Sequence, residues 1–243
     1  MRFNPVLISI PLFASAVLAG QIYPQTQFHN GVEKCTNTTS DSSWGGAVGH
    51  GDNGTFHYVT GSFKVPDIAG QKIGSTAVAL IGIDGTGSCS DRKLQVGVIF
   101  TTTENGPVYR PAYWFGAGGV PRQFTRPLEV SAGDAIELWI GAPLHGLTGM
   151  VLYENRSKNQ SAFKTVNITH QALCRQTTEW IVEYLEGYPL ANFSMVTFTD
   201  AMAFAKGNRT FMPQEATIVD IQENGRVLTS VSVDGSSVTV NHV

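Results

Sequence analysis

Short apolar segments, most of them alternating with polar residues, constrain the fold of this chain more than any other feature. They begin at Trp44 and are separated by turn-forming residues at intervals of about 8–12 residues, as in β-sandwiches and β-barrels. No segment has the apolar spacing of an amphipathic helix longer than about two turns. The sequence therefore predicts an all-β, single-domain protein. The strands that we expect are 56–65, 76–83, 94–102, 135–140, 149–153, 179–185, 195–199, 217–221, 227–233 and 238–240.

Three dipeptides mark tight turns: Asp84-Gly85, Asn224-Gly225 and Asp234-Gly235. Their residues tolerate the positive φ angles that two-residue hairpin loops require. The clearest case is the end of the chain, TIVDIQENGRVLTSVSVDGSSVTV, which predicts three strands joined by the Asn-Gly and Asp-Gly turns.

The charge content is low. Asp, Glu, Lys and Arg make up 14% of the 243 residues, compared with roughly 25% in an average soluble protein, and the net charge is −3. The chain has no run of Lys or Arg. Because binding to a phosphate backbone requires clustered positive charge, we expect no nucleic-acid partner. Low charge with abundant Gly, Ser, Thr and Val is typical of an all-β extracellular protein.

Residues 1–19 have the pattern of a secretory signal peptide, with Arg2 as the positive charge, an apolar stretch over 6–18, and small residues after it. The apolar stretch is short for a membrane span, although an uncleaved anchor is the alternative. No later segment is long and apolar enough to cross a bilayer, so we expect a secreted protein that is free of the membrane. Residues 20–42 are polar and aperiodic, which predicts a short pro-segment or flexible arm before a domain over 43–243.

The cysteines and the glycosylation sequons agree with export. Two of the three cysteines should pair in an oxidising compartment. We predict the pair Cys89–Cys174, because both lie in the body of the domain, whereas Cys35 lies in the N-terminal segment. The cysteine spacings match no zinc pattern, so we predict no metal site. The sequons, which support export only together with the signal peptide, are at Asn37, Asn53, Asn155, Asn159, Asn167, Asn192 and Asn208.

Common catalytic and nucleotide-binding motifs are absent or incomplete. Residues 49–54 fit G-x-G-x-x-G, but they follow no buried strand and open no helix, so we interpret them as glycine turns. Residues 84–88 are similar to the Asp-Thr-Gly-Ser motif of pepsin-like enzymes, but an extra Gly interrupts the motif and no second copy supplies the other carboxylate. Neither G-x-S-x-G nor H-E-x-x-H occurs.

Two predicted strands each have one apolar core face and one face that carries polar side chains. In 94–100 the even-numbered residues are Leu, Val, Val and Phe, and they form one apolar face. The opposite face holds Gln95, and the neighbouring Gly97 leaves room for another group to approach. In 178–184, Trp180 and other apolar residues share one face, and the other holds Glu179, Ile181 and Glu183.

Periodicity alone leaves the role of these two carboxylates open, since both could point to solvent from an exposed sheet face. They cannot form a glycosidase dyad with each other. Four residues of strand place them about 13 Å apart, whereas catalytic carboxyls lie roughly 5–5.5 Å apart in retaining enzymes and 6.5–9.5 Å apart in inverting ones. A carboxylate partner from another strand remains an alternative.

Several segments resemble, in the same order, the signature stretches of the glutamic peptidases, also called eqolisins. The similarity runs from about Trp44 to the C-terminus. It departs from the family at Leu80, where members usually carry Trp, and in 109–115, which lacks the aspartate and glutamate of the family. The matching segments are SWGGA at 43–47, IGIDG at 81–85, LQVGV at 94–98, TEWIVE at 178–183, residues 193–198 and the tail VLTSVSVDGSSVTV.

The resemblance implies a sandwich of two antiparallel β-sheets with a substrate cleft on a concave face. It also implies an acid-active endopeptidase that acts on polypeptide substrates without metal or cofactor. We expect the protein to be a monomer. Gln95 matches the catalytic glutamine and Glu179 the catalytic glutamate. The remaining matches are the cleft residues Trp44, Asp84 and Gln176, which are expected to contact the substrate, and the disulfide cysteines Cys89 and Cys174.

The chemistry of this pair suits peptide hydrolysis. A glutamate near its reference pKa of about 4.3 can act as an ionised base in mild acid and later return the proton. A glutamine cannot titrate, but its NH₂ can donate to a developing oxyanion while its C=O holds the water. We therefore predict Glu179 as general base and then acid, with Gln95 positioning water and binding the oxyanion. This prediction requires their two strands to lie side by side. The alternatives are an inactive sandwich that binds peptide or glycan, and a glycosidase on a similar sandwich.

Overall fold

The computed structural model describes residues 38–116, 119–168, 171–185 and 187–243. The predicted signal peptide, most of the predicted arm, Cys35 and Asn37 therefore lie outside the described residues. Within the described residues, no helix is long and apolar enough to cross a membrane.

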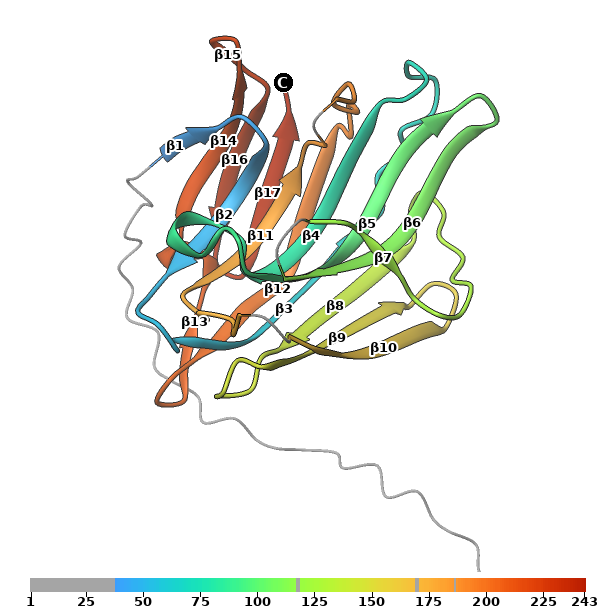
Figure 1. Cartoon of the computed structure of the whole chain (residues 1–243). Coiled ribbons are helices and arrows are strands. Elements are labelled where there is room, and N and C mark those ends of the chain that lie inside the picture. Colours follow the sequence, from blue (N-terminus) through green and yellow to red (C-terminus); the bar gives the residue numbers. More distant parts are fainter. Residues whose placement is uncertain (1–37, 117–118, 169–170, 186) are drawn as a thin grey trace, which may run out of the picture. The chain divides into compact units, whose positions relative to one another are not determined.

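Two β-sheets pack face to face, which confirms the predicted β-sandwich (Figure 1). Neighbouring strands are antiparallel except β1 and β14, which pair in parallel. The order in the first sheet, sheet A, is β1 (Thr38–Asp41), β14 (Thr217–Glu223), β2 (Trp44–His50), β11 (Thr177–Glu183), β4 (Thr76–Asp84), β5 (Lys93–Thr103), β6 (Gly106–Phe115) and β7 (Arg122–Gln123), with β15 (Arg226–Val227) beside β14. The order in sheet B is β10 (Gln160–Asn167), β9 (Thr148–Asn155), β8 (Ala135–Gly141), β3 (Phe56–Lys64), β12 (Met195–Ala205), β17 (Ser237–His242) and β16 (Thr229–Asp234), with β13 (Arg209–Phe211) beside β12.

The core lies between the inner faces of the two sheets. The predicted apolar face of β5, from Leu94 to Phe100, belongs to this core, and all four of its residues are fully buried. Trp180 of β11 is buried in the same core, and its indole nitrogen donates to the carbonyl of Thr60 on β3 at 2.8 Å. The alternation read from the sequence therefore assigned both faces of β5 and β11 correctly, so Gln95 and Glu179 lie on the outer face of sheet A.

Helical structure among the described residues is limited to two single turns of 3₁₀-helix, η1 (Gly87–Cys89) and η2 (Pro213–Glu215). Two of the three predicted turns form as expected: Asn224 and Gly225 both have positive φ between β14 and β15, and Gly235 has positive φ between β16 and β17. The third dipeptide, Asp84-Gly85, has the expected positive φ angles, but it opens a longer connection that contains η1 and not a two-residue hairpin loop.

Other differences from the predicted strands have local causes. Strand β6 was missed because it contains Pro107 and Pro111, which are tolerated because β7 pairs only with Ala112 and Tyr113 on its outer side. Strand β10 was missed because it is an edge strand with few inward apolar residues. The predicted strand 227–233 divides between the sheets as β15 and β16. Strand β1 lies before the domain start expected at residue 43.

One predicted glycosylation site is contradicted. The Asn155 side chain is fully buried, and its Nδ2 donates to Asp134 Oδ2 at 2.7 Å and to the carbonyl of Glu129 at 3.0 Å. A glycan on this nitrogen would displace both bonds inside the fold. The other described sequon asparagines are exposed and remain predictions: Asn53, Asn159, Asn167, Asn192 and Asn208.

Candidate active site

Gln95 and Glu179 meet above a glycine of the strand that separates them. Strand β4 lies between β5 and β11, so these two strands are not direct neighbours, contrary to our expectation that they lie side by side. Gly82 of β4 is in register with Gln95 on one side and with Glu179 on the other. Since side chains directly across a strand share a face, the two polar groups extend toward each other over Gly82.

The absence of a side chain at Gly82 makes this contact possible. A Cβ at this position would lie 2.8 Å from both Cγ and Cδ of Glu179, closer than such atoms approach in proteins. Any other residue would therefore push the carboxyl group away from Gln95. Sequence reasoning placed Gly82 within a signature stretch but did not recognise this role, although a glycine inside an apolar strand often marks such a close approach.

The two side chains form a buried hydrogen bond. Gln95 Nε2 donates to Glu179 Oε1 at 2.5 Å, and the exposed fractions of the residues are 3% and 0%. The alternative that Glu179 points to solvent is therefore wrong; Glu183, on the same face, is partly buried. Glu179 Oε2 and Gln95 Oε1 are buried without a hydrogen-bond partner in the protein. Buried polar atoms are normally paired, so these two atoms are where a reactant could be held.

Burial raises the pKa of Glu179 to about 8, above the value near 4.3 that we expected from the reference. The hydrogen bond from Gln95 opposes this shift, and the charges of Glu183 and Asp84 add to it. The Lys93 ammonium favours the ionised form. Without a bound water, burial therefore favours the neutral form of Glu179.

The outer face of sheet A around the pair is apolar. Trp44, a predicted cleft residue, is only partly buried and packs against this cluster. Both departures from the family pattern contribute to it: Leu80 on β4, and Trp114 on β6, which is in register with Gln95. Val48, which is in register with Glu179, and Trp114 place apolar side chains directly beside the pair. The buried members of the cluster are Val48, Val78, Leu80, Ile99, Ala112, Trp114 and Ile181.

Asp84, which we predicted to contact the substrate, is held inside the fold. It is fully buried and has a φ of 60°. Its carboxylate accepts backbone N–H groups from Arg175 at 2.7 Å, Gln176 at 2.8 Å and Thr177 at 3.3 Å. Burial raises the pKa of Asp84, and these backbone hydrogen bonds oppose the increase. Asp84 therefore fixes the segment that leads into β11, two residues before Glu179.

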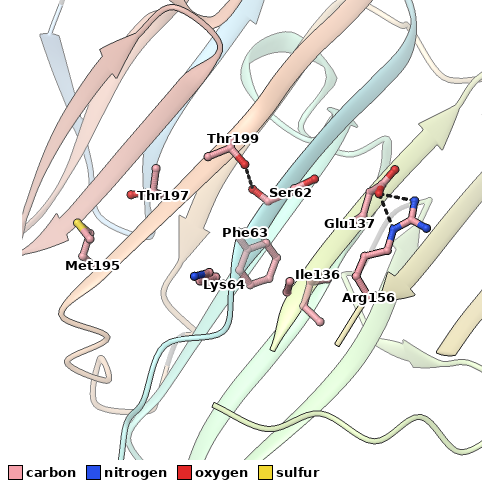
Figure 2. Close-up of a pocket in the computed structure, with 10 residues that line it drawn as sticks. Ser62, Phe63, Lys64, Ile136, Glu137, Arg156, Met195, Thr197 and Thr199 are labelled. Atoms are coloured by element: carbon pink, nitrogen blue, oxygen red, sulfur yellow. Dashed lines mark hydrogen bonds and ion pairs between the residues drawn. The ribbon is translucent and has the colours of Figure 1, made fainter. Parts of the chain in front are cut away.

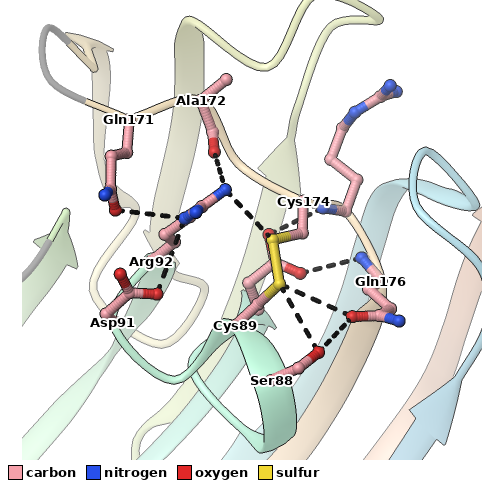
Figure 3. A network of polar contacts seen from close by, with 10 residues as sticks. Ser88, Cys89, Asp91, Arg92, Gln171, Ala172, Cys174 and Gln176 are labelled. Atoms are coloured by element: carbon pink, nitrogen blue, oxygen red, sulfur yellow. Dashed lines mark hydrogen bonds and ion pairs between the residues drawn. A yellow bond between two sulfur atoms is a disulfide. The ribbon is translucent and has the colours of Figure 1, made fainter.

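A disulfide holds the same segment from the other side. Cys89, at the end of η1, is bonded to Cys174, which confirms the predicted pair (Figure 3). The Ser88 hydroxyl donates to Gln176 Oε1 at 2.8 Å, so this predicted cleft residue is bound to the loop that carries the disulfide (Figure 3). The η1 loop and the start of β11 are thus fastened together next to the Gln95–Glu179 pair.

A pocket of about 430 Å³ lies elsewhere, on the outer face of sheet B (Figure 2). Ser62 and Lys64 of β3 line it, and Phe63 between them belongs to the core, so the pocket opens away from sheet A. The Arg156–Glu137 ion pair at 2.6 Å forms one wall. The pocket contains no member of the predicted pair, and we do not assign it to catalysis.

The described residues contain no group of three or more His, Cys, Asp or Glu side chains that could hold a metal ion. Two residues beside the pair were not predicted from the sequence. Gly85 has a φ of 107°, and a Cβ there would lie 3.1 Å from Gln95 Nε2. Lys93 lies on the outer face of β5, two residues before Gln95, and alternation along the strand could have placed it there.

Comparisons with known proteins identify the family of this chain. The model of the Peptidase A4 family matches residues 42–242. Aspergillopepsin-2 of Aspergillus niger is 34% identical over 232 residues, which cover 86% of this chain and 80% of that protein. Scytalidopepsin B of Scytalidium lignicola is 30% identical over 219 residues, which cover 84% and 79%.

Solved structures show the same fold. Scytalido-glutamic peptidase with a peptide-based transition state analogue superposes with a TM-score of 0.72 at 28% identity, over 84% of this chain and 100% of that one. Aspergilloglutamic peptidase from Aspergillus niger gives a TM-score of 0.63 at 35% identity, over 70% and 99%. The chain therefore belongs to the peptidase A4 family and is a glutamic peptidase.

Proposed function

We propose that this protein is a secreted acid endopeptidase in which Glu179 and Gln95 are the catalytic pair. The observation that carries the proposal is their buried hydrogen bond, which leaves one oxygen of each side chain without a protein partner. Those two oxygens can hold one water molecule between them. Gln95 Oε1 can accept a hydrogen bond from the water and Glu179 Oε2 can take its proton, which is the arrangement that hydrolysis needs.

In the first step, Glu179 Oε2 takes a proton from water while the water oxygen bonds to the carbonyl carbon of the scissile peptide. The electron pair of the C=O bond moves to oxygen, and Gln95 Nε2 stabilises this oxyanion with its second N–H, since an amide nitrogen carries two. In the second step, Oε2 gives the proton to the amide nitrogen, the C–N bond breaks, and a carboxylic acid and an amine leave. Glu179 ends ionised, as it began.

The raised pKa of Glu179 is compatible with this cycle. Its main cause is burial, which penalises the ionised form. A water that donates a hydrogen bond to Oε2 favours the ionised form and lowers the pKa. We therefore expect the acid limit of activity to lie above the pH at which an ordinary glutamate titrates.

Two observations support polypeptide substrates and an extracellular site of action. The matched relatives include scytalido-glutamic peptidase bound to a peptide-based transition state analogue, and an eqolisin in complex with the tripeptide Ala-Ile-His. The Cys89–Cys174 disulfide is typical of proteins that fold in oxidising compartments, in agreement with the predicted signal peptide.

The test is to incubate the purified protein with an unfolded protein at about pH 3–6 and to follow cleavage on a gel, together with Glu179→Gln and Gln95→Ala. We expect cleavage that resists chelators and aspartic-peptidase inhibitors, and a loss of about 10²–10³-fold or more in each variant. Full activity in either folded variant would refute the pair. Peptide or glycan binding without cleavage would instead support the inactive binder, and cleavage of oligosaccharides the glycosidase.

A further inference from the structure

Lys93 lies against the catalytic pair but has no part in the mechanism described above. It is half-buried on the outer face of β5, two residues before Gln95. The position that a Cβ of Gly85 would occupy lies 3.2 Å from Lys93 Cβ, 3.1 Å from Gln95 Nε2 and 3.5 Å from Glu179 Oε1. All three side chains thus border the same position beside the η1 loop.

The Lys93 side chain extends toward the connection that follows β6. A Cβ at Gly119 would lie 3.2 Å from Lys93 Nζ and 3.6 Å from Cε. The carbonyl of Lys93 accepts the N–H of Gly116 at 2.9 Å, which fixes the backbone at this position. Among the described residues, no carboxylate forms an ion pair with Nζ, so the ammonium charge is not neutralised by a direct partner there.

Without Lys93, the charges that act on Glu179 would all be negative. Asp84, at the end of β4, and Glu183, on β11, both act against its ionisation, and β2 places the uncharged Val48 opposite it. Lys93, on β5, is the cation that acts on both Glu179 and Glu183. In this apolar surrounding, the attraction between the Lys93 ammonium and an ionised Glu179 is screened less than it would be in water.

We propose that Lys93 is a positioning residue that stabilises the ionised form of Glu179 and so sets the acid limit of the reaction. This inference rests on the proposed function of the pair. Lys93 exchanges no proton with the substrate in this role; it acts only through the charge of Glu179. The proposal therefore predicts a shift along the pH axis and not a loss of activity at every pH.

The test compares the pH dependence of kcat/KM in Lys93→Met, Lys93→Arg and the wild type, with Lys64→Met as the control. Lys64 is an exposed lysine on the outer face of sheet B, away from the pair. We expect the acid limb of Lys93→Met to move up by about one pH unit, with activity recovering above it, because an opposite charge lowers a carboxyl pKa by about 1–3 units. Lys93→Arg should restore the wild-type limb, and Lys64→Met should not move it.

The proposal would be overturned if the pH profile of kcat/KM for Lys93→Met superposed on that of the wild type. An equal loss of kcat/KM at every pH would also overturn it, because that result would indicate a structural role. Thermal unfolding midpoints of all four proteins show whether the fold is kept. The two proposals fail in distinguishable ways. If the wild type cleaves no peptide bond, the proposed function fails. If the wild type cleaves and requires Glu179, but replacing Lys93 does not shift the acid limb of kcat/KM, only the inference about Lys93 fails.

Discussion

Glu179 accepts a hydrogen bond from Gln95 across an intervening strand, at the one point where that strand carries a glycine. The sites of the two residues are separated by β4, and the side chains span it because Gly82 contributes no Cβ. The geometry of the pair thus depends on three strands, and the middle strand must have no side chain at the point of contact.

The first prediction concerns Gly82. Gly82→Ala should place a methyl group against the Glu179 carboxyl and separate it from Gln95. Because a displacement of about 1 Å can cost about 10²-fold in rate, we expect kcat/KM for a peptide substrate to fall by about that factor. The control is Gly61→Ala on β3, where the new methyl group meets the Trp180 side chain at 3.1 Å, on the face of β11 opposite to Glu179. Wild-type activity in Gly82→Ala would show that the pair tolerates a different geometry.

The second prediction links the pKa of Glu179 to stability. Because its folded pKa is raised from about 4.5 to about 8, the folded state holds a proton that the unfolded chain releases in this interval. The free energy of unfolding should therefore be greatest below about pH 4.5 and fall as the pH rises toward 8, by a few kcal/mol at most. Glu179→Gln cannot ionise, so it should lack this decrease.

Urea unfolding at pH 4.5, 6 and 8 measures this effect. Glu104→Gln, which replaces an exposed glutamate, serves as the matched control and should follow the wild type. Parallel pH dependence in the wild type and Glu179→Gln would mean that the carboxyl is hydrated in solution and titrates as an ordinary glutamate.

The strand faces were predictable from the sequence because they depend on local alternation. The even-numbered residues of 94–100 are buried as expected, and Gln95 lies opposite them. The choice of Gln95 and Glu179 as a pair came from the family resemblance. Periodicity cannot show that two residues 84 positions apart meet, because strand order and register across β4 are set by contacts along the whole chain.

Contacts between residues distant in sequence could not be predicted from the sequence. Asp84 was expected in the cleft and Asn155 at the surface, but both side chains bind groups that belong to other segments. The raised pKa of Glu179 has the same origin. It follows from burial, which arises only when the neighbouring strands of sheet A come together around this side chain.

The third prediction concerns the disulfide. Replacing Cys89 and Cys174 together with Ser removes a crosslink between residues 85 positions apart. Loss of a native disulfide from a small secreted domain typically costs about 2–5 kcal/mol, so we expect a clear drop in the denaturant midpoint. Cys35→Ser is the control and should leave the midpoint unchanged, since the other two cysteines are already paired. A destabilised Cys35→Ser would indicate a different pairing of the cysteines in solution.

The fourth prediction separates two roles for Asp84. If Asp84 fixes the start of β11, Asp84→Asn should be destabilised by about 1–3 kcal/mol, because the new NH₂ group faces backbone donors that lose their acceptor. Its kcat should also fall, since the displaced segment carries Glu179. Asp91→Asn, in an exposed ion pair at 3.6 Å, is the matched control and should change stability by about 1 kcal/mol or less. If Asp84→Asn kept wild-type stability and kcat but raised KM, the side chain would contact the substrate, as the sequence first suggested.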